Sequence, residues 1–326
     1  MKLPTRVVLA AVLVAVFGIS GLHGQNVISA KPGLVHHIQG DVLLDGKPVS
    51  LSGTRFPSME AGSVLVTQNG RAEILLNPGA FLRVSEEGEV RMVQNNLLDT
   101  RVELVKGMAL LECVELAKGT SLSLVHGGAT VFVLRPGLYR VGGDPAQVRI
   151  YDGKARVTLA GGSVEMKSGR FLMLDGTSLK AQKFNKKKEL ADSFYRWSAY
   201  RAQYITNANM ASARQMWQDG VSWRVGSWFW NPFFGCFTYL PGRGYLYSPF
   251  GFTYWSPGGY YDYFYRPRPI YADSGGGHPG YIGTPATSSG TSGTVAVTGA
   301  PTAAPAAGAS PAPIDRSSSQ GSGRGR

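Results

Sequence analysis

The sequence has few cysteines, few charged residues and no long apolar run. Its 326 residues include 2 cysteines, which excludes a disulfide-dense small fold and a zinc site built from cysteine alone. Charged residues make up 17% of the chain, below the usual share of about 25%, whereas the 43 glycines are nearly twice the usual share of about 7%. These proportions exclude a charged coiled coil and indicate a turn-rich, β-rich protein of about two folded units.

The most apolar stretch of the chain lies near the N-terminus. Lys2 and Arg6 precede an apolar run over residues 7–19, and small residues follow it up to Gly24. A membrane-spanning helix needs about 20 apolar residues, so this run is too short to span a bilayer. The order of charged, apolar and small residues predicts a signal peptide over residues 1–24, cleaved near Gly24. We therefore expect a periplasmic or secreted protein with no transmembrane anchor after cleavage.

Residues 25–182 alternate apolar and polar side chains in short runs separated by turns. Asp45-Gly46 and Asn69-Gly70 are typical of tight hairpin turns, because both residue types tolerate positive φ. No helical periodicity interrupts the runs. The pattern predicts an antiparallel all-β domain with many short strands.

A basic linker and an amphipathic helix are predicted over residues 183–216. The linker contains Lys186-Lys187-Lys188, and no glycine or proline occurs from there to Arg214. Apolar or aromatic side chains recur at helical spacing and are interrupted once by an arginine: Leu190, Phe194, Trp197, Arg201 and Tyr204. We expect this stripe to dock on the β domain. A helix lying on a membrane surface is the alternative.

Residues 217–272 are rich in aromatic residues, proline and glycine. Residues 217–271 hold 21 of the 35 aromatic residues of the chain. Four aromatic-x-proline units follow one another at spacings of eight or nine residues, from Trp230-Asn231-Pro232 to Trp255-Ser256-Pro257. Proline confines each unit to a turn or a strand edge. We predict a small meander of very short strands with an aromatic core. Residues 273–326 are mostly Gly, Ser, Thr, Ala and Pro, which predicts a disordered tail.

Motifs of catalysis and metal binding are missing. The chain has no Gly-x-Ser-x-Gly elbow, no His-Glu-x-x-His or Cys-x-x-Cys spacing and no glycine-rich phosphate loop. His36 and His37 are adjacent, so on a regular strand they would point to opposite faces and could not share a metal. We therefore predict a protein that is not an enzyme and that has no metal or cofactor.

The two cysteines allow two interpretations. Export would permit a disulfide between Cys113 and Cys236, which would tie the β domain to the aromatic module. Alternatively, both are buried free thiols, since cysteine often serves as a small hydrophobic residue.

The β domain resembles the FecR domain, the periplasmic sensor module of iron-uptake transmembrane regulators. The resemblance lies in the order of five loose motifs across residues 33–176: Gly62–Gly79, Val102–Gly107, Gly137–Val141, Val148–Gly153 and Ser168–Leu172. The chain has Gly137-Leu-Tyr-Arg where that family often has Gly-Thr-x-Phe. Regulators of the family carry a cytoplasmic anti-sigma domain before a membrane helix, whereas here about six residues precede the apolar run. We therefore do not carry the signalling role over, and the resemblance implies no catalytic residue.

Two functions follow from these features. The first is an exported, non-enzymatic cell-envelope protein that binds peptidoglycan or polysaccharide by stacking sugar rings on exposed aromatic side chains, and the candidates are Trp228, Trp230, Tyr239, Tyr247 and Trp255. The same rings could instead form only the core of a small module. The second function is a structural or protein-interaction scaffold, or a periplasmic sensor component without catalysis. Because the protein is expected to be exported, no physiological nucleic-acid partner is expected.

Overall fold

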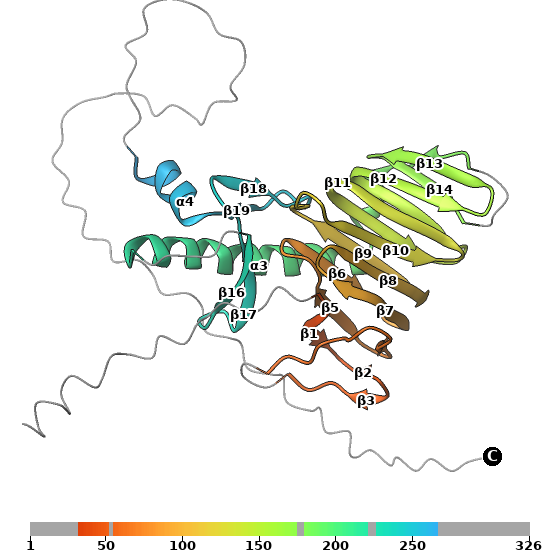
Figure 1. The fold of residues 1–326 in the computed structure, drawn as a ribbon, viewed down its shortest axis with the longest axis horizontal. Coiled ribbons are helices and arrows are strands. Elements are labelled where there is room, and N and C mark those ends of the chain that lie inside the picture. The colour runs from red at the N-terminus through yellow and green to blue at the C-terminus, as the bar shows by residue number, and fades with distance from the viewer. Residues whose placement is uncertain (1–31, 52–54, 175–178, 221–225, 267–326) are drawn as a thin grey trace, which may run out of the picture. The chain divides into compact units, whose positions relative to one another are not determined.

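The computed structural model describes residues 32–51, 55–174, 179–220 and 226–266, which are drawn as ribbon in Figure 1. All of these residues belong to one compact unit that ends at Arg268, and a second unit begins at Pro269. The predicted signal peptide and the predicted tail lie outside the described residues.

Fifteen strands form one large sheet, which confirms the predicted all-β domain. The strand order is β1-β5-β6-β9-β11-β10-β8-β7-β4-β2-β3, and β12 extends it beside β11 and pairs with β13 and β14. The strands are β1 Leu34–Gln39, β2 Val42–Leu44, β3 Lys47–Pro48, β4 Val64–Thr67, β5 Arg71–Leu75, β6 Ala80–Val84, β7 Gly88–Asn96, β8 Asp99–Lys106, β9 Met108–Cys113, β10 Ser121–His126, β11 Ala129–Gly142, β12 Gln147–Leu159, β13 Gly162–Lys167, β14 Arg170–Met173 and β15 Gln182–Lys183.

One pair of strands departs from the predicted antiparallel arrangement. Strands β8 and β10 are parallel, with Leu122 opposite Thr100. They can be parallel because β9, which lies between them in the sequence, pairs with β6 and β11 instead. The sheet is therefore mixed.

The two predicted hairpin turns have different outcomes. Asp45 and Gly46, with φ of 50° and 76°, close the β2–β3 hairpin as predicted. The prediction for Asn69-Gly70 is wrong, because β4 pairs with β2 and β7 and not with β5. Gly70 lies against the backbone there, and a Cβ would come within 2.5 Å of the Gln39 carbonyl oxygen. Glycine is needed at this position for close packing.

The sheet is covered on both faces at β5, β6 and β9. One face of these strands contributes to the main core, for example through Ile74, Leu82 and Leu111. The opposite face carries Leu75 and Phe81, which belong to a second cluster. Every residue of β6 is buried as a result.

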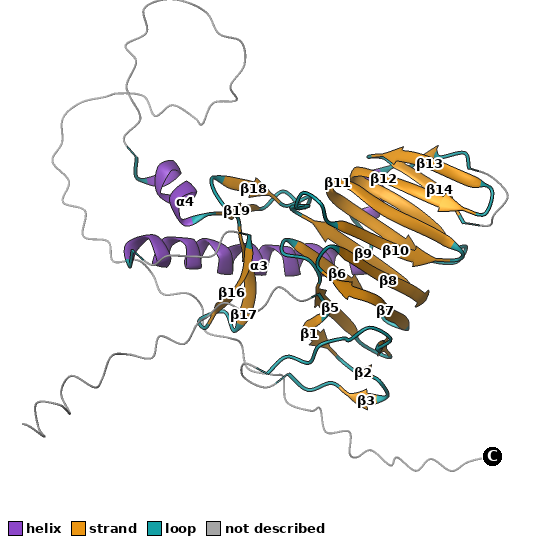
Figure 2. Cartoon of the chain, in the orientation of Figure 1, coloured by secondary structure: helices purple, strands orange, loops and turns teal. Residues whose placement is uncertain are grey.

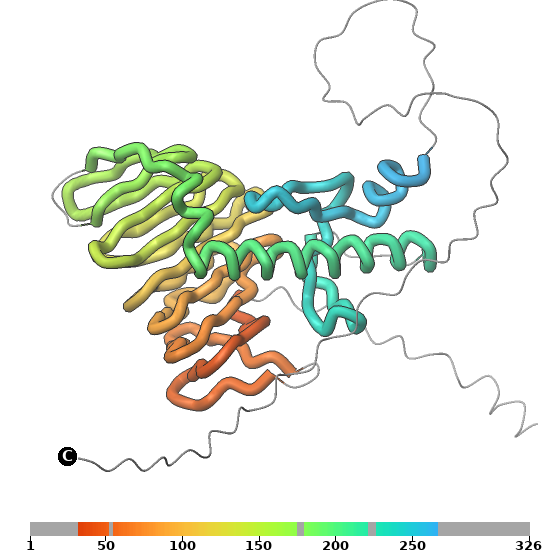
Figure 3. The backbone as a smooth tube through the Cα atoms, turned by 180° about the vertical axis from the view of Figure 1, so that it is seen from behind, coloured from red at the N-terminus to blue at the C-terminus, as the bar shows by residue number. Residues whose placement is uncertain are grey.

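A helix and two hairpins supply the other residues of this second apolar cluster. Helix α3 spans Ser193–Gln218 after the single turn α2, Lys186–Glu189. The hairpins are β16 Ser227–Asn231 with β17 Cys236–Leu240, and β18 Tyr245–Tyr247 with β19 Thr253–Trp255. Helix α4 spans Pro257–Phe264. Figures 2 and 3 show α3 as one continuous helix, with β16–β17 on one side and β18–β19 with α4 on another.

Helix α3 begins later than the sequence suggested. The Asp192 side chain caps it by accepting a hydrogen bond from the Tyr195 N–H at 2.7 Å. Leu190 therefore lies before the helix and is exposed. Phe194 docks on the β domain as predicted, since it is buried with Leu110 and Leu138, and Arg201 contacts Glu73. Tyr204 instead packs against Phe234 of the aromatic segment.

The aromatic segment is not a single meander. It forms two separate hairpins followed by α4, whose start is explained by the last aromatic-x-proline unit. The Ser256 hydroxyl accepts a hydrogen bond from the Gly259 N–H at 3.0 Å, and Pro257 occupies the first turn, where its missing N–H costs nothing.

Candidate functional site

A buried ionic network joins the sheet to α3. Glu73 on β5 lies opposite Arg83 on β6, and its Oε2 is 2.9 Å from Arg83 Nε. Its Oε1 is 2.9 Å from Arg201 Nη2 on α3. Arg83 also contacts Glu112 on β9 at 2.8 Å, and Glu112 accepts a hydrogen bond from the Ser248 hydroxyl. These four charged side chains are almost completely buried, so the network fixes the sheet against the helix.

His36 completes this network in its neutral form. The Phe237 N–H donates to His36 Nε2 at 2.8 Å, so Nδ1 carries the proton and donates to Glu73 Oε1 at 2.9 Å. Burial lowers the pKa of His36 despite the nearby carboxylate. Burial alone would raise the pKa of Glu73, but Arg201 and Arg83 outweigh it and hold that pKa well below its usual range.

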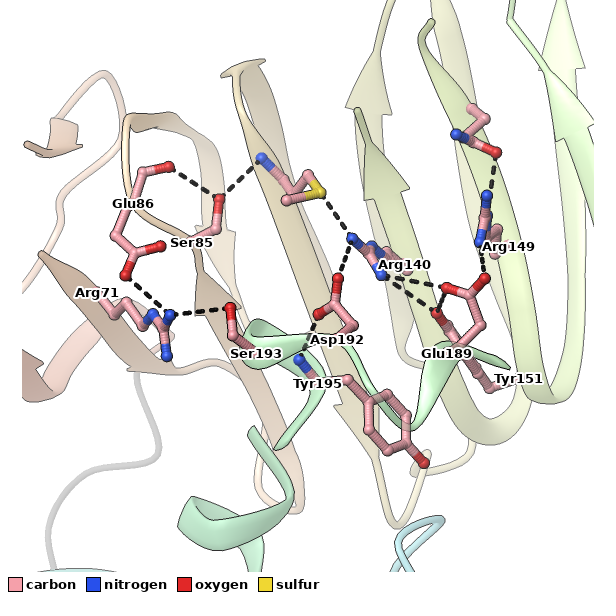
Figure 4. A network of polar contacts seen from close by, with 12 residues as sticks. Arg71, Ser85, Glu86, Arg140, Arg149, Tyr151, Glu189, Asp192, Ser193 and Tyr195 are labelled. Atoms are coloured by element: carbon pink, nitrogen blue, oxygen red, sulfur yellow. Dashed lines mark hydrogen bonds and ion pairs between the residues drawn. The ribbon is translucent and has the colours of Figure 1, made fainter. Parts of the chain in front are cut away.

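A second, more exposed ionic cluster anchors the start of α3. Figure 4 shows Arg140 between Asp192 and Glu189, with ion-pair distances of 3.2 and 3.4 Å. Arg149 also contacts Glu189, and the Tyr151 hydroxyl donates to the same carboxylate at 2.9 Å. The residues that set the helix start are thus held by strands β11 and β12.

Most of the aromatic rings chosen from the sequence are buried. Trp228 and Tyr239 lie in the second apolar cluster, and the Trp255 ring is buried with Ala213 of α3 and Tyr260 of α4. Trp230 is half-buried. For Trp228, Tyr239 and Trp255 the structure shows the alternative of a core role, and these three rings present little or no face to solvent. Tyr247 is the exposed member of the set.

A continuous exposed aromatic surface lies elsewhere in the same segment. It consists of side chains that are between 42% and 65% exposed: Trp217, Tyr245, Tyr247, Tyr263, Phe264 and Tyr265. Neighbouring rings are in contact, with centroids 5.4 Å apart for Tyr245 and Tyr247 and 4.9 Å apart for Tyr263 and Phe264. Tyr260 and Tyr261 of α4 link the remaining rings, and Tyr261 stacks on Trp217 at 4.2 Å. Trp255 lies beneath, 4.9 Å from Tyr263. We call these six exposed residues the aromatic surface.

Both cysteines are free thiols. Cys113 is buried in the main core, and Cys236 is buried at the start of β17. The candidate disulfide is therefore not formed in this structure. Burial raises the pKa of each thiol to about 12, which disfavours the reactive thiolate.

His36 and His37 line one cavity, contrary to the prediction of opposite faces. The pairing of β1 with β5 shifts register between Val35 and His37, so the regular alternation is broken there. The cavity has a volume of about 550 Å³ and lies between β1 and α3. Within the described ranges, no group of three or more His, Cys, Asp or Glu side chains could hold a metal ion.

Neither the ionic network nor the aromatic surface was predicted from the sequence. A signal for the network was present, because Arg201 interrupts an otherwise aromatic stripe on the packing face of the helix. Charged residues on a packing face are rarely buried unless they are paired. Glu73, Arg83 and Glu112 each lie in a short run that predicts a strand, where a charged side chain is usually expected to face solvent.

The chain matches no family model and no curated protein. Two solved structures are similar to part of it, and both are crystal structures of a proposed anti-sigma factor from Parabacteroides distasonis ATCC 8503. The first is 17% identical, with a TM-score of 0.33, over 41% of this chain and 62% of that one. The second is 16% identical, with a TM-score of 0.33, over 49% and 74%. The chain thus spans about three fifths of the length of the first neighbour.

No helix among the described residues is both long enough and apolar enough to cross a membrane.

Proposed function

We propose that this protein is an exported, non-enzymatic cell-envelope protein that binds peptidoglycan or envelope polysaccharide through the aromatic surface. The main support for this proposal is the set of six exposed aromatic side chains, whose rings are connected by contacts directly or through Tyr260 and Tyr261. The FecR resemblance and the N-terminal signal-peptide pattern support the envelope location, which is part of this proposal. Of the rings first chosen, Tyr247 belongs to the aromatic surface, and Trp255 supports it from beneath.

The exposure of these rings is costly unless a partner covers them. A soluble domain rarely presents a large contiguous apolar patch, and such patches mark interaction sites. Six neighbouring aromatic side chains at the end of α3, on β18 and on α4 form such a patch. The surface therefore has the character of a binding site.

Its chemistry fits an extended, neutral polymer of sugar rings. The C–H face of a sugar packs against an aromatic face, and the tyrosine hydroxyls at the ring edges can hydrogen-bond to sugar hydroxyls. Asp262 of α4 and Arg266, which follows the helix, contact each other at 3.6 Å. The six side chains of the aromatic surface are themselves uncharged, so the surface offers stacking faces and hydroxyl groups. A row of rings suits a repeating polymer better than a single small ligand.

Co-sedimentation with purified peptidoglycan and cell-surface polysaccharide tests this proposal. We expect the full chain to be retained at low and at high salt, because stacking is screened far less than ion pairing. We expect the triple variant Tyr247→Ala, Tyr263→Ala, Tyr265→Ala to lose at least about tenfold in affinity, equivalent to about 1.4 kcal/mol. The matched control is Phe233→Ala, because Phe233 is an even more exposed ring outside the aromatic surface.

Two results would contradict the proposal. One is the absence of retention on any polymer, and the other is equal retention of the triple variant and the parent. In either case the scaffold function would become the leading hypothesis, and crosslinking in cells would identify a protein partner.

A further inference from the structure

We propose that the cavity between β1 and α3 binds one or two rings of a neutral saccharide. The inference goes beyond the polymer-binding surface, because none of the residues that line the cavity belongs to the aromatic surface. Its volume of about 550 Å³ lies within the range of about 300–1,000 Å³ that is common for small-ligand sites.

The walls of the cavity are mainly aromatic. Trp197, Tyr200 and Tyr204 line it from α3, and Phe234 lines it from the turn between β16 and β17. The Tyr204 hydroxyl donates to the Phe234 carbonyl oxygen at 2.6 Å, and the two rings meet edge to face at 5.4 Å. This pair is held in place without a ligand, so that part of the wall is preorganised.

Polar side chains also line the cavity. His37 and Gln39 of β1 line the same cavity, and the His37 and Trp197 ring centroids are 6.3 Å apart. Gln39 and Tyr200 are exposed, which places them at the opening. A sugar ring needs such a combination, since its C–H faces stack on aromatic rings while its hydroxyls need donors and acceptors.

The charges of the cavity favour a neutral ligand. Arg201 is the lining residue with a permanent charge, and its Nη2 is already paired with Glu73 at 2.9 Å. Burial and then the charge of Arg201 lower the pKa of His37 to about 4, so its imidazole is neutral near pH 7. The lining holds no carboxylate for a cationic ligand, and Glu73 already balances the charge of Arg201, whose unpartnered Nε can donate to a sugar hydroxyl. A charged ligand would therefore lose its hydration without a full counter-charge.

Titration of the full chain with N,N′-diacetylchitobiose or maltose, followed by the NMR signals of the tryptophan indole N–H groups, tests the proposal. The Trp197→Phe variant assigns the Trp197 signal. We expect at least one disaccharide to shift that signal in a saturable way, and glucuronic acid to bind more weakly than the neutral sugar. Tyr200→Ala and Gln39→Ala should each weaken the effect, Tyr200→Ala by about tenfold.

The control is Tyr247→Ala, because Tyr247 and Tyr200 are both tyrosines with nearly equal exposure, 65% and 63%. We expect Tyr247→Ala to leave the Trp197 shift unchanged. The proposal is overturned if neither disaccharide shifts the Trp197 signal, if Tyr200→Ala does not weaken the shift, or if glucuronic acid binds more tightly. These outcomes are independent of polymer retention, which is measured with variants of Tyr247, Tyr263 and Tyr265.

Discussion

At the residue scale, Glu73 connects the sheet to helix α3. Its carboxylate is fully buried and contacts Arg83, Arg201 and His36. Such a group is stable only because each charge has a partner, since an unpaired buried charge costs several kcal/mol. Glu73 also accepts the Nδ1 proton of His36, whose Nε2 accepts from the Phe237 N–H.

We predict that Glu73→Gln destabilises the protein by about 3–5 kcal/mol, because it leaves two buried arginines with one carboxylate between them. Denaturant unfolding followed by far-UV circular dichroism measures this loss. Glu165→Gln is the control, because Glu165 pairs with Arg156 at the surface and should matter little. Equal effects of the two substitutions would contradict the assigned role of Glu73.

Stability should also fall as the pH drops from about 7 to 4. His36 and His37 have pKa values below 6.5 in the folded chain, about 4 for His37, so the unfolded chain binds protons that the native state does not. Each histidine then removes at most about 1.4 kcal/mol per pH unit. The contribution of Glu73, whose pKa is lowered, is present above pH 4.5 and is lost at lower pH.

Denaturant midpoints measured between pH 7 and pH 4 test this dependence. His37→Gln should reduce the slope, because it removes one of the two histidines without breaking the bond between His36 and Glu73. A flat midpoint over this range, or an unchanged slope in the variant, would show that these histidines are not neutral in the folded state.

At the element scale, α3 organises the aromatic segment. Asn209, fully buried on this helix, donates to the carbonyl oxygens of Tyr239 and Trp255 at 2.8 and 2.9 Å and accepts from the Trp255 N–H at 2.6 Å. One side chain thus connects both hairpins to the helix. Asn231 adds hydrogen bonds from β16 to Ala208 and Ser212.

We predict that Asn209→Ala lowers the free energy of unfolding by about 2–4 kcal/mol, since it leaves buried backbone groups of both hairpins without partners. The matched control is Asn207→Ala, two residues away on the exposed side of the same helix. Tryptophan fluorescence and denaturant unfolding measure both variants. A loss in Asn207→Ala as large as in Asn209→Ala would indicate a general helix effect.

At the scale of the whole molecule, the β domain and the aromatic segment share a core. Leu75, Phe81 and Val114 of the β domain are buried together with Trp228 and Tyr254 from the hairpins. The described parts of the predicted segments 25–182 and 217–272 therefore belong to one compact unit. Among the strands with a single partner, β3 and β15 have two residues each, whereas β1 and β13 have six residues each and offer more edge for a further strand.

We predict that a chain ending at Gln182 binds the dye ANS and unfolds without a sharp transition, because it exposes the buried charges and rings on the outer face of β5, β6 and β9. A chain ending at Arg268 should unfold at the same denaturant concentration as the full chain. ANS fluorescence measures the exposed apolar surface of the shorter chain, and denaturant unfolding compares the transitions of both chains with that of the full chain. Cooperative unfolding of the shorter chain would show that the β domain is independent of α3.

The sequence by itself determined the local structure of this protein. Alternating side chains, the Asp45-Gly46 turn and the glycine-free stretch around Arg201 specify short strands and one amphipathic helix, because these signals act between residues close in the chain. Tertiary structure alone decided that β5 and β6 are covered on both faces. Glu73 and Arg83 look solvent-facing until Arg201, more than a hundred residues later, supplies the paired charge that makes their burial possible. The same long-range packing buried Trp228 and Tyr239 and left Tyr247 exposed, a choice that no local pattern among equally aromatic residues could make.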